Sequence, residues 1–312
     1  MAPEGIESGC SIKLAKSQLV RKSLTSRMYL FPLGSFAALA CITGCALGSP
    51  LVIDREWNAF DNDHGHGCHT FDYQHQEKWP ELHFESRQCA SGHHQSPIDL
   101  SNAPWSTLHK PSFAFPGGHS VDGWVFNRCF GPEWNPKAQA HAPALHFDGQ
   151  AYSLLQWHTH TPSSEHAVIG GRTAGEIHFV FGDGSGPKAV FGVPLVHGGY
   201  SNFFSSVLGN GSLAWPGVKD PYTRIEIALN FSEFFNDAHT NKYWTYSGSL
   251  TTPNCTEGIR WFISGFKHPM SDQEFTRLND VSIDSVRDLQ KIDRQFVDSS
   301  LDDGQRVRHE DM

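Results

Sequence analysis

The stretch from Phe71 to about Lys267 is a succession of short apolar segments interrupted by Gly, Pro, Asn and Ser. Two of these segments are "KAVFGVPLVHGG", which begins at Lys188, and "TRIEIALNF", which begins at Thr223. Segments of this kind are typical of β-strands that are joined by turns. The stretch contains no internal repeat and no linker that would divide it. We therefore expect one β-rich domain.

Helical signals occur only near the C-terminal end. "SDQEFTRL" has Ser271 as a candidate N-cap and Glu274 three residues later, which is the pattern of a capping box. In the following "SIDSVRDLQKIDRQF", apolar residues recur at helical spacing, at Ile283, Val286, Leu289 and Ile292. We expect two peripheral helices here, followed by a disordered polar tail over residues 299–312.

The N-terminal part contains an apolar run over residues 28–48, "MYLFPLGSFAALACITGCALG". The run follows basic residues and ends in small ones, which is typical of a cleavable secretory signal. An uncleaved membrane anchor is the alternative, because the run is just long enough to cross a bilayer. We expect residues 1–48 to be an extension with a signal peptide, and residues 49–70, with the His-rich "DNDHGHGCH", to be a flexible arm. The protein would then be secreted.

The cysteines agree with export. Of the seven, Cys10, Cys41 and Cys45 precede the proposed cleavage, which leaves Cys68, Cys89, Cys129 and Cys255. An even number of cysteines in an exported chain indicates disulfides, although the sequence alone does not fix their pairing. Glycosylation sequons occur at Asn210, Asn230 and Asn254.

The charge distribution argues against a nucleic-acid partner. Lys and Arg total 24 against 33 Asp and Glu, so the formal net charge is -9. The basic residues are scattered and form no stripe, whereas proteins that bind nucleic acid carry a basic surface.

The stretch "YSLLQWHTHT" is rich in aromatic and Thr residues and predicts a strand. Side chains alternate along a strand, so Gln156, His158 and His160 share one face, while Trp157 lies on the other. The two imidazoles then lie roughly 7 Å apart along the backbone and point the same way.

A second strand, "GEIHFVF" over 175–181, follows after a Gly- and Pro-containing turn, and its Glu176, His178 and Val180 share a face. If the two strands are neighbours, three imidazoles meet, and three histidines with an open fourth position are typical of a catalytic zinc site. Gln156 and Glu176 would each accept the second N–H of a ligand ring. The alternative is a hydrogen-bonded cluster of strand histidines without a metal.

These stretches also match a known family. "QSPIDL" at 95–100, "QWHTH" at 156–160, "EH" at 165–166, "EIHFV" at 176–180 and "YWTYSGSLTTPNCTEGIRW" at 243–261 resemble, in order and spacing, the α-class carbonic anhydrases. The resemblance covers the chain from Phe71 to about Lys267.

The resemblance implies a fold and an activity. The fold is mainly β: a single domain over residues 71–298, built on a large twisted, mostly antiparallel central β-sheet with short peripheral helices. The activity is that of a carbonate dehydratase, a secreted zinc lyase that hydrates CO₂ reversibly to bicarbonate and a proton by attack of zinc-bound hydroxide. CO₂ and bicarbonate are the small-molecule partners, and a membrane is one only if the signal segment stays uncleaved.

The resemblance also assigns roles to single residues. His158, His160 and His178 would bind Zn²⁺, with water as the fourth ligand. Thr251 would accept the proton of the zinc-bound hydroxide in a hydrogen bond and donate its own to Glu165. The remaining implied residues bind substrate, namely Thr252 beside bicarbonate and Val180, Val190, Leu250 and Trp261 around CO₂.

Relatives that are secreted pair a cysteine just before "QSP" with one after "TTP", which implies a Cys89–Cys255 disulfide here. Cys68 and Cys129 are then paired by elimination. The family's closing Asn-x-Arg-Pro segment is not recognisable in this chain.

The family's proton-shuttle histidine also has no counterpart. The matching stretch is "VDGWVF", which puts Trp124 at the shuttle position, with Tyr73, Asp122 and Asn127 around the cavity mouth. Trp has no group that titrates near neutral pH. We expect an active but slower enzyme, or one that uses another histidine such as His119 or His94.

Two alternative functions fit the sequence less well. A catalytically silent binding module on the same fold is disfavoured, because such relatives usually lose a zinc ligand and this chain keeps all three. A different zinc hydrolase is disfavoured because the chain has no His-Glu-x-x-His helix.

Overall fold

The computed structural model describes residues 71–208, 223–292 and 297–298. The strands are β1 (Ser112–Ala114), β2 (Ser120–Asn127), β3 (Pro132–Pro136), β4 (Ala144–Phe147), β5 (Gln150–His160), β6 (Gly175–Asp183), β7 (Gly186–His197), β8 (Ile225–Asn230), β9 (Tyr243–Ser249), β10 (Glu257–Ser264) and β11 (His268–Met270). The α-helices are α1 (Trp79–Leu82), α2 (Gln88–Ser91), α3 (Asn202–Leu208), α4 (Asp237–Thr240) and α5 (Asp272–Asp280). Short 3-10 turns cover Gln76–Lys78, Glu85–Arg87 and Gln139–His141.

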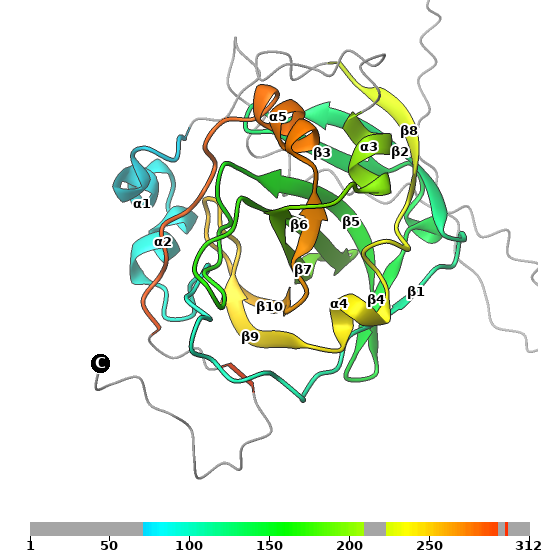
Figure 1. Ribbon diagram of the computed structural model, residues 1–312. Helices are drawn as coiled ribbons and strands as arrows, with labels where there is room; N and C mark the ends of the chain where they lie inside the picture. The colour runs from blue at the N-terminus through cyan, green and yellow to red at the C-terminus, as the bar shows by residue number, and fades with distance from the viewer. Residues whose placement is uncertain (1–70, 209–222, 293–296, 299–312) are drawn as a thin grey trace, which may run out of the picture. The chain divides into compact units, whose positions relative to one another are not determined.

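The strands of the described residues form one 11-stranded sheet, whose main path is β8-β2-β3-β5-β6-β7-β10-β9. Neighbouring strands are antiparallel except that β7 runs parallel to β10 and to β11. The sheet occupies the middle of Figure 1, and the helices lie around it. The expected mainly β fold with a mostly antiparallel central sheet and short peripheral helices is confirmed.

The two central strands separate apolar from polar side chains. On β5 and β6, Trp157, Ile177 and Phe179 are fully buried in the larger hydrophobic core, which α3 and α5 also join through Phe204 and Phe275. The side chains between them point to the opposite face, as expected from strand alternation. The histidines therefore lie on the face of the sheet away from that core.

The opposite face of the sheet has a smaller apolar cluster of its own. Val180, Val190 and Trp261 belong to it, together with Trp244 and Tyr246 from β9. Each of these five side chains is at most 2% exposed. The histidines are thus bordered by an apolar surface within the sheet itself.

Helix α5 begins as the sequence indicates. The Ser271 hydroxyl accepts a hydrogen bond from the backbone of Glu274, and the Glu274 carboxylate accepts one from the backbone N–H of Ser271. This reciprocal pair is a capping box, which satisfies two N–H groups that have no partner within the helix.

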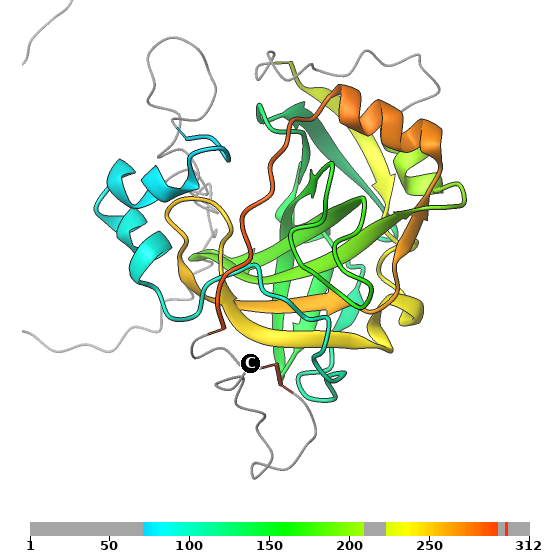
Figure 2. The ribbon, with the colours of Figure 1, turned by 60° about the vertical axis from the view of Figure 1, so that its left-hand side comes forward.

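The prediction of a second peripheral helix is wrong. Residues 281–292, the described part of this stretch, have no helical assignment, and Ile283 and Leu289 are exposed instead of forming an apolar face. Figures 1 and 2 show this stretch running from the end of α5 back across the sheet towards α1 and α2. Its backbone bonds to distant residues, as Gln290 N–H does to the Pro97 carbonyl at 2.7 Å. Tertiary hydrogen bonds therefore override the helical spacing of its apolar residues.

The Cys89–Cys255 disulfide is present. It ties α2 to the turn between β9 and β10, across a sequence separation of 166 residues. Cys129 is also disulfide-bonded. Cys68, its expected partner, lies outside the described residues, as do the proposed signal segment, the arm and the tail. None of the helices within the described ranges is long and apolar enough to span a bilayer.

The long loop closed by this disulfide leads to a stability prediction. Replacing both partners, C89A with C255A, should lower the free energy of unfolding by roughly 2–5 kcal/mol, because the cross-link restricts the unfolded chain. Urea unfolding of the variant, which retains the Cys129 disulfide, measures the change. A free energy within about 0.5 kcal/mol of the parent protein would contradict the prediction.

Candidate functional site

Three histidines from two neighbouring strands meet on the polar face of the sheet. His158 and His160 lie on β5, and His178 lies on β6 directly opposite His158. The Nε2 atoms of His158 and His160 are 3.1 Å apart, and one ring nitrogen from each of the three histidines lies within 4.8 Å of the others. The structure therefore brings together the three ligands expected from the sequence.

The other nitrogen of each ring faces a hydrogen-bond acceptor. His158 Nδ1 lies 2.8 Å from Gln156 Oε1, and His178 Nε2 lies 3.0 Å from Glu176 Oε1. His160 Nδ1 lies 2.6 Å from the backbone carbonyl of Ser285. An acceptor requires a proton on the nitrogen that faces it, so His158 Nε2, His160 Nε2 and His178 Nδ1 are left as lone pairs.

Three converging lone pairs fit a zinc ion. Nitrogens bound about 2.0–2.1 Å from Zn²⁺ in a tetrahedron lie about 3.3 Å from each other, close to the 3.1 Å between the two Nε2 atoms. Two unprotonated nitrogens at that distance repel each other unless a cation lies between them. The donor set and the acceptors behind it thus match those of a three-histidine zinc site.

Burial disfavours the protonated form of the two imidazoles on β5. Burial, with the neighbouring His160 and His178, lowers the pKa of His158 well below its ordinary value. Burial likewise lowers the pKa of His160. Burial alone would raise the pKa of Glu176, but the adjacent His166 and His178 hold it well below its usual range. Neutral imidazoles backed by an ionised carboxylate are the form that binds a metal.

Glu176 is held in place by a second set of contacts. Its Oε1 accepts from His166 Nδ1 at 2.9 Å, and its Oε2 accepts from the His166 backbone N–H at 2.8 Å. His166 Nε2 in turn contacts the Tyr246 hydroxyl at 2.8 Å. The group of His166, Glu176 and His178 is therefore a hydrogen-bonded chain behind the site, since its polar atoms already bond to one another.

A glycine on the next strand makes room for this arrangement. Gly192 on β7 lies directly opposite His178. A Cβ at this position would lie 2.7 Å from Glu176 Oε1 and 3.4 Å from a carbon of the His178 ring. Any side chain here would displace the carboxylate that orients the ligand.

Glu165 lies against the ligands and is fully buried. Its Oε2 lies 3.6 Å from His160 Nε2 and 3.9 Å from His178 Nδ1, and its Oε1 accepts from the Arg287 backbone N–H at 2.9 Å. Among the described residues, Oε2 has no hydrogen-bond partner, Thr251 included. A buried carboxylate oxygen normally has a donor, so this atom is available to a hydroxyl in the cavity.

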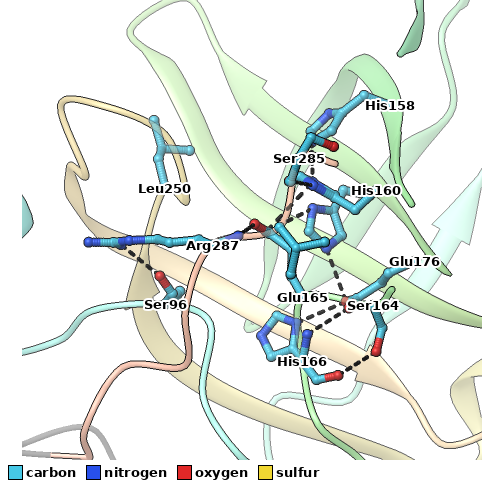
Figure 3. Close-up of polar contacts among 12 residues, drawn as sticks. Ser96, His158, His160, Ser164, Glu165, His166, Glu176, Leu250, Ser285 and Arg287 are labelled. Atoms are coloured by element: carbon cyan, nitrogen blue, oxygen red, sulfur yellow. Dashed lines mark hydrogen bonds and ion pairs between the residues drawn. The ribbon is translucent and has the colours of Figure 1, made fainter. Parts of the chain in front are cut away.

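The sequence reasoning missed two residues that support the site from the stretch after α5. Figure 3 shows Ser285 beside His160, and Arg287 extending from Glu165 to Ser96. The Arg287 guanidinium donates to the Ser96 carbonyl at 2.7 Å, and burial lowers the pKa of Arg287 to about 10.

A cavity opens above the histidines. It is lined on one side by apolar side chains expected from the sequence, namely Val180, Val190, Leu250 and Trp261. Thr251 and Thr252 line it as well, and the turn that carries them is closed by a 2.6 Å bond from Cys255 N–H to the Thr252 carbonyl. The cavity therefore places a dry surface and two hydroxyl groups beside the three imidazoles.

The opposite side of the cavity was not anticipated. It holds an ion pair between Arg128 and Glu133, 3.0 Å apart, and Glu133 pairs with His158 across β3 and β5. Neither residue belongs to a motif that the sequence singled out. The sequence does not show that β3 pairs with β5, and this pairing is what brings Glu133 next to His158.

The expected position of Trp124 is wrong. Trp124 lies on β2, which is separated from β5 by β3, and its ring contacts Lys137 instead of lining the cavity. Asp122 and Asn127 do not line the cavity either, whereas Tyr73 does. Phe130, from the connection between β2 and β3, also lines the cavity, with its ring centroid 5.1 Å from that of Tyr73.

The two alternative shuttle histidines are also remote. His119 precedes β2 and stacks on Phe115, and His94 binds Glu257 through its backbone. Within the described part of the chain, the cavity lining contains no histidine other than the three converging ones.

Comparison with known proteins agrees with this geometry. Residues 211–301 match the family model of the eukaryotic-type carbonic anhydrases. The chain is 30% identical over 244 residues to α carbonic anhydrase 4 of Arabidopsis thaliana, covering 74% of this chain and 76% of the relative. It is also 30% identical to a carbonic anhydrase of Neisseria gonorrhoeae, over 74% of this chain and 89% of the relative.

A solved structure shares the fold. The α-carbonic anhydrase of Thermovibrio ammonificans, in complex with the inhibitor sulfanilamide, superposes with a TM-score of 0.64 at 26% identity, covering 75% of this chain and 99% of that one. Three findings agree. The sheet is shared with this structure, three histidines converge on one face of it, and the relatives match over most of their length. The chain belongs to the α-class carbonic anhydrase family.

Proposed function

We propose that the protein is a zinc enzyme that interconverts CO₂ with bicarbonate and a proton. The observation that supports this best is the set of three imidazole lone pairs, each fixed by an acceptor behind its ring, at the base of a cavity with one apolar wall. His158, His160 and His178 would hold the ion. When bound, Zn²⁺ would supply a nucleophile at neutral pH, because it lowers the pKa of coordinated water.

Thr251 and Glu165 would set the direction of the hydrogen bonds at the centre. The partnerless Oε2 of Glu165 would accept the hydrogen of the Thr251 hydroxyl. The Thr251 oxygen then presents only lone pairs to the cavity, so whatever faces it must donate a hydrogen bond. The Thr251 backbone N–H would orient bicarbonate, with Thr252 beside it.

The apolar wall would bind CO₂ and keep water away from it. Val180, Val190 and Trp261 are each at most 2% exposed. A linear molecule without charge loses little on leaving water, and it would rest on this surface next to the nucleophile. Bicarbonate is charged and gains nothing from such a wall, which favours its release.

The route of the protein to its place of action is also a proposal. The N-terminal apolar run and the Cys89–Cys255 disulfide support secretion with a cleaved signal peptide. The sequons would then be exposed to glycosylation.

The proposed roles of Thr251 and Glu165 are tested by stopped-flow CO₂ hydration with the zinc-loaded chain. We expect clear activity, a loss of roughly 10²-fold for T251A, and retention of most activity for T251S, which keeps the hydroxyl. Zinc content and melting temperature are measured on each variant. A zinc-loaded parent no faster than the uncatalysed reaction would overturn the function, and equal rates for T251A and T251S would overturn the role of the hydroxyl.

The residues that line the cavity lead to a prediction about how the released proton passes from the cavity to the buffer. With no other histidine among the described lining residues, the hydration rate should rise with buffer concentration, because the buffer must take the proton. F130H, which adds an imidazole to the cavity lining, should raise the rate at low buffer by roughly tenfold, and F130L should not. A parent rate already saturated at low buffer would contradict this, and would mean that a histidine outside the described residues reaches the cavity.

A further inference from the structure

Two of the three sequons lie in the described part of the chain, and they differ in their surroundings. Asn230 is the last residue of β8 and is exposed, as is Ser232, whereas Phe231 between them is fully buried. Asn230 Oδ1 accepts a hydrogen bond from the Ser232 backbone N–H at 2.9 Å. The side chain thus closes a turn that brings residues one and three of the sequon together at the surface.

This geometry fits what N-glycosylation requires. The sugar is transferred to the side-chain amide of the Asn, and recognition depends on the hydroxyl two residues later. At Asn230 both groups are exposed, and the buried Phe231 anchors the turn to the core. A glycan attached here would extend into solvent without disturbing packed residues.

Asn254 presents the opposite case. It is half-buried, and its Oδ1 accepts a hydrogen bond from Ser86 at 2.8 Å, a residue with no exposed surface. The next residue, Cys255, is fully buried and bonded to Cys89. This hydrogen bond holds the amide in place, so a glycan on Asn254 Nδ2 would have to find room where α2 meets the turn that carries Thr251.

The place of Asn230 in the sheet also separates it from the site. Among the described strands, β8 lies at one end of the sheet, where it pairs with β2, at the rim in Figure 1. No residue of Ile225–Asn230 lines the cavity. A glycan on Asn230 is therefore compatible with an open cavity.

We propose that Asn230 carries an N-linked glycan in the mature protein and that Asn254 does not. The proposal rests on the secretory route proposed above, which brings the chain to the glycosylation machinery. Asn210 lies outside the described residues, and no assignment is made for it.

The test is glycopeptide mass spectrometry on the full chain, expressed behind an added secretory signal in a eukaryotic host. The added signal forces export, so the result does not depend on the chain's own N-terminal segment. An endoglycosidase that leaves one sugar on each occupied Asn provides the mass tag. We expect the tag on the Asn230 peptide and an unmodified Asn254 peptide. An unmodified Asn230, or a tag on Asn254, would overturn the assignment.

Two variants of the third sequon residue serve as matched controls. S232A should remove the glycan on Asn230, and S232T should keep it, while both leave CO₂ hydration unchanged because Ser232 is remote from the cavity. A tag on Asn230 in S232A would show that the modification is not sequon-dependent and would contradict the proposal. Sequencing the N-terminus of the chain secreted under its own signal tests the secretory route separately.

Discussion

The antiparallel pairing of β5 with β6 is the constraint on which the site depends. It sets His158 opposite His178, and the two-residue period of a strand puts His160 on the same face. A shift of this register by one residue would turn the ligands into the core and Trp157 out of it. The fully buried aromatic side chains on the far face oppose such a shift, because exposing them would cost several kcal/mol. The hydrophobic core thus fixes the positions of the three histidines.

A polar site inside a protein must satisfy its own hydrogen bonds. Here Glu176 accepts hydrogen bonds from His166 and His178, and Arg287 lies beside Glu165 with its guanidinium on the Ser96 carbonyl. These bonds come from segments far apart in the sequence, so they also hold the stretch after α5 against the sheet. The Oε2 atom of Glu165, which faces the nitrogens of His160 and His178, has no hydrogen-bond partner among the described residues. This oxygen is the acceptor that the proposed role of the Thr251 hydroxyl requires.

The sequence predicted the features that depend on local pattern. Strand alternation placed Gln156 and Glu176 behind the ligands, and the capping box at Ser271 formed as expected. The sequence did not predict which segments far apart in the chain lie next to one another. Trp124 was assigned to the proton-shuttle position from the resemblance of its stretch to the family, whereas β3 separates its strand from β5 and Trp124 does not line the cavity. The stretch with Ser285 and Arg287 has helical spacing, but its backbone bonds to His160, Glu165 and Pro97 decide its shape.

The central claim is that the three rings are held in fixed tautomers whose lone pairs converge. Long-range ¹H–¹⁵N NMR of the zinc-loaded protein, with assignments from single-histidine variants, measures this directly. We expect His158 and His160 to carry their proton on Nδ1 and to bind zinc through Nε2, and His178 to show the reverse. A different tautomer at any of the three rings, or a histidine shift that does not respond to zinc removal, would contradict the account.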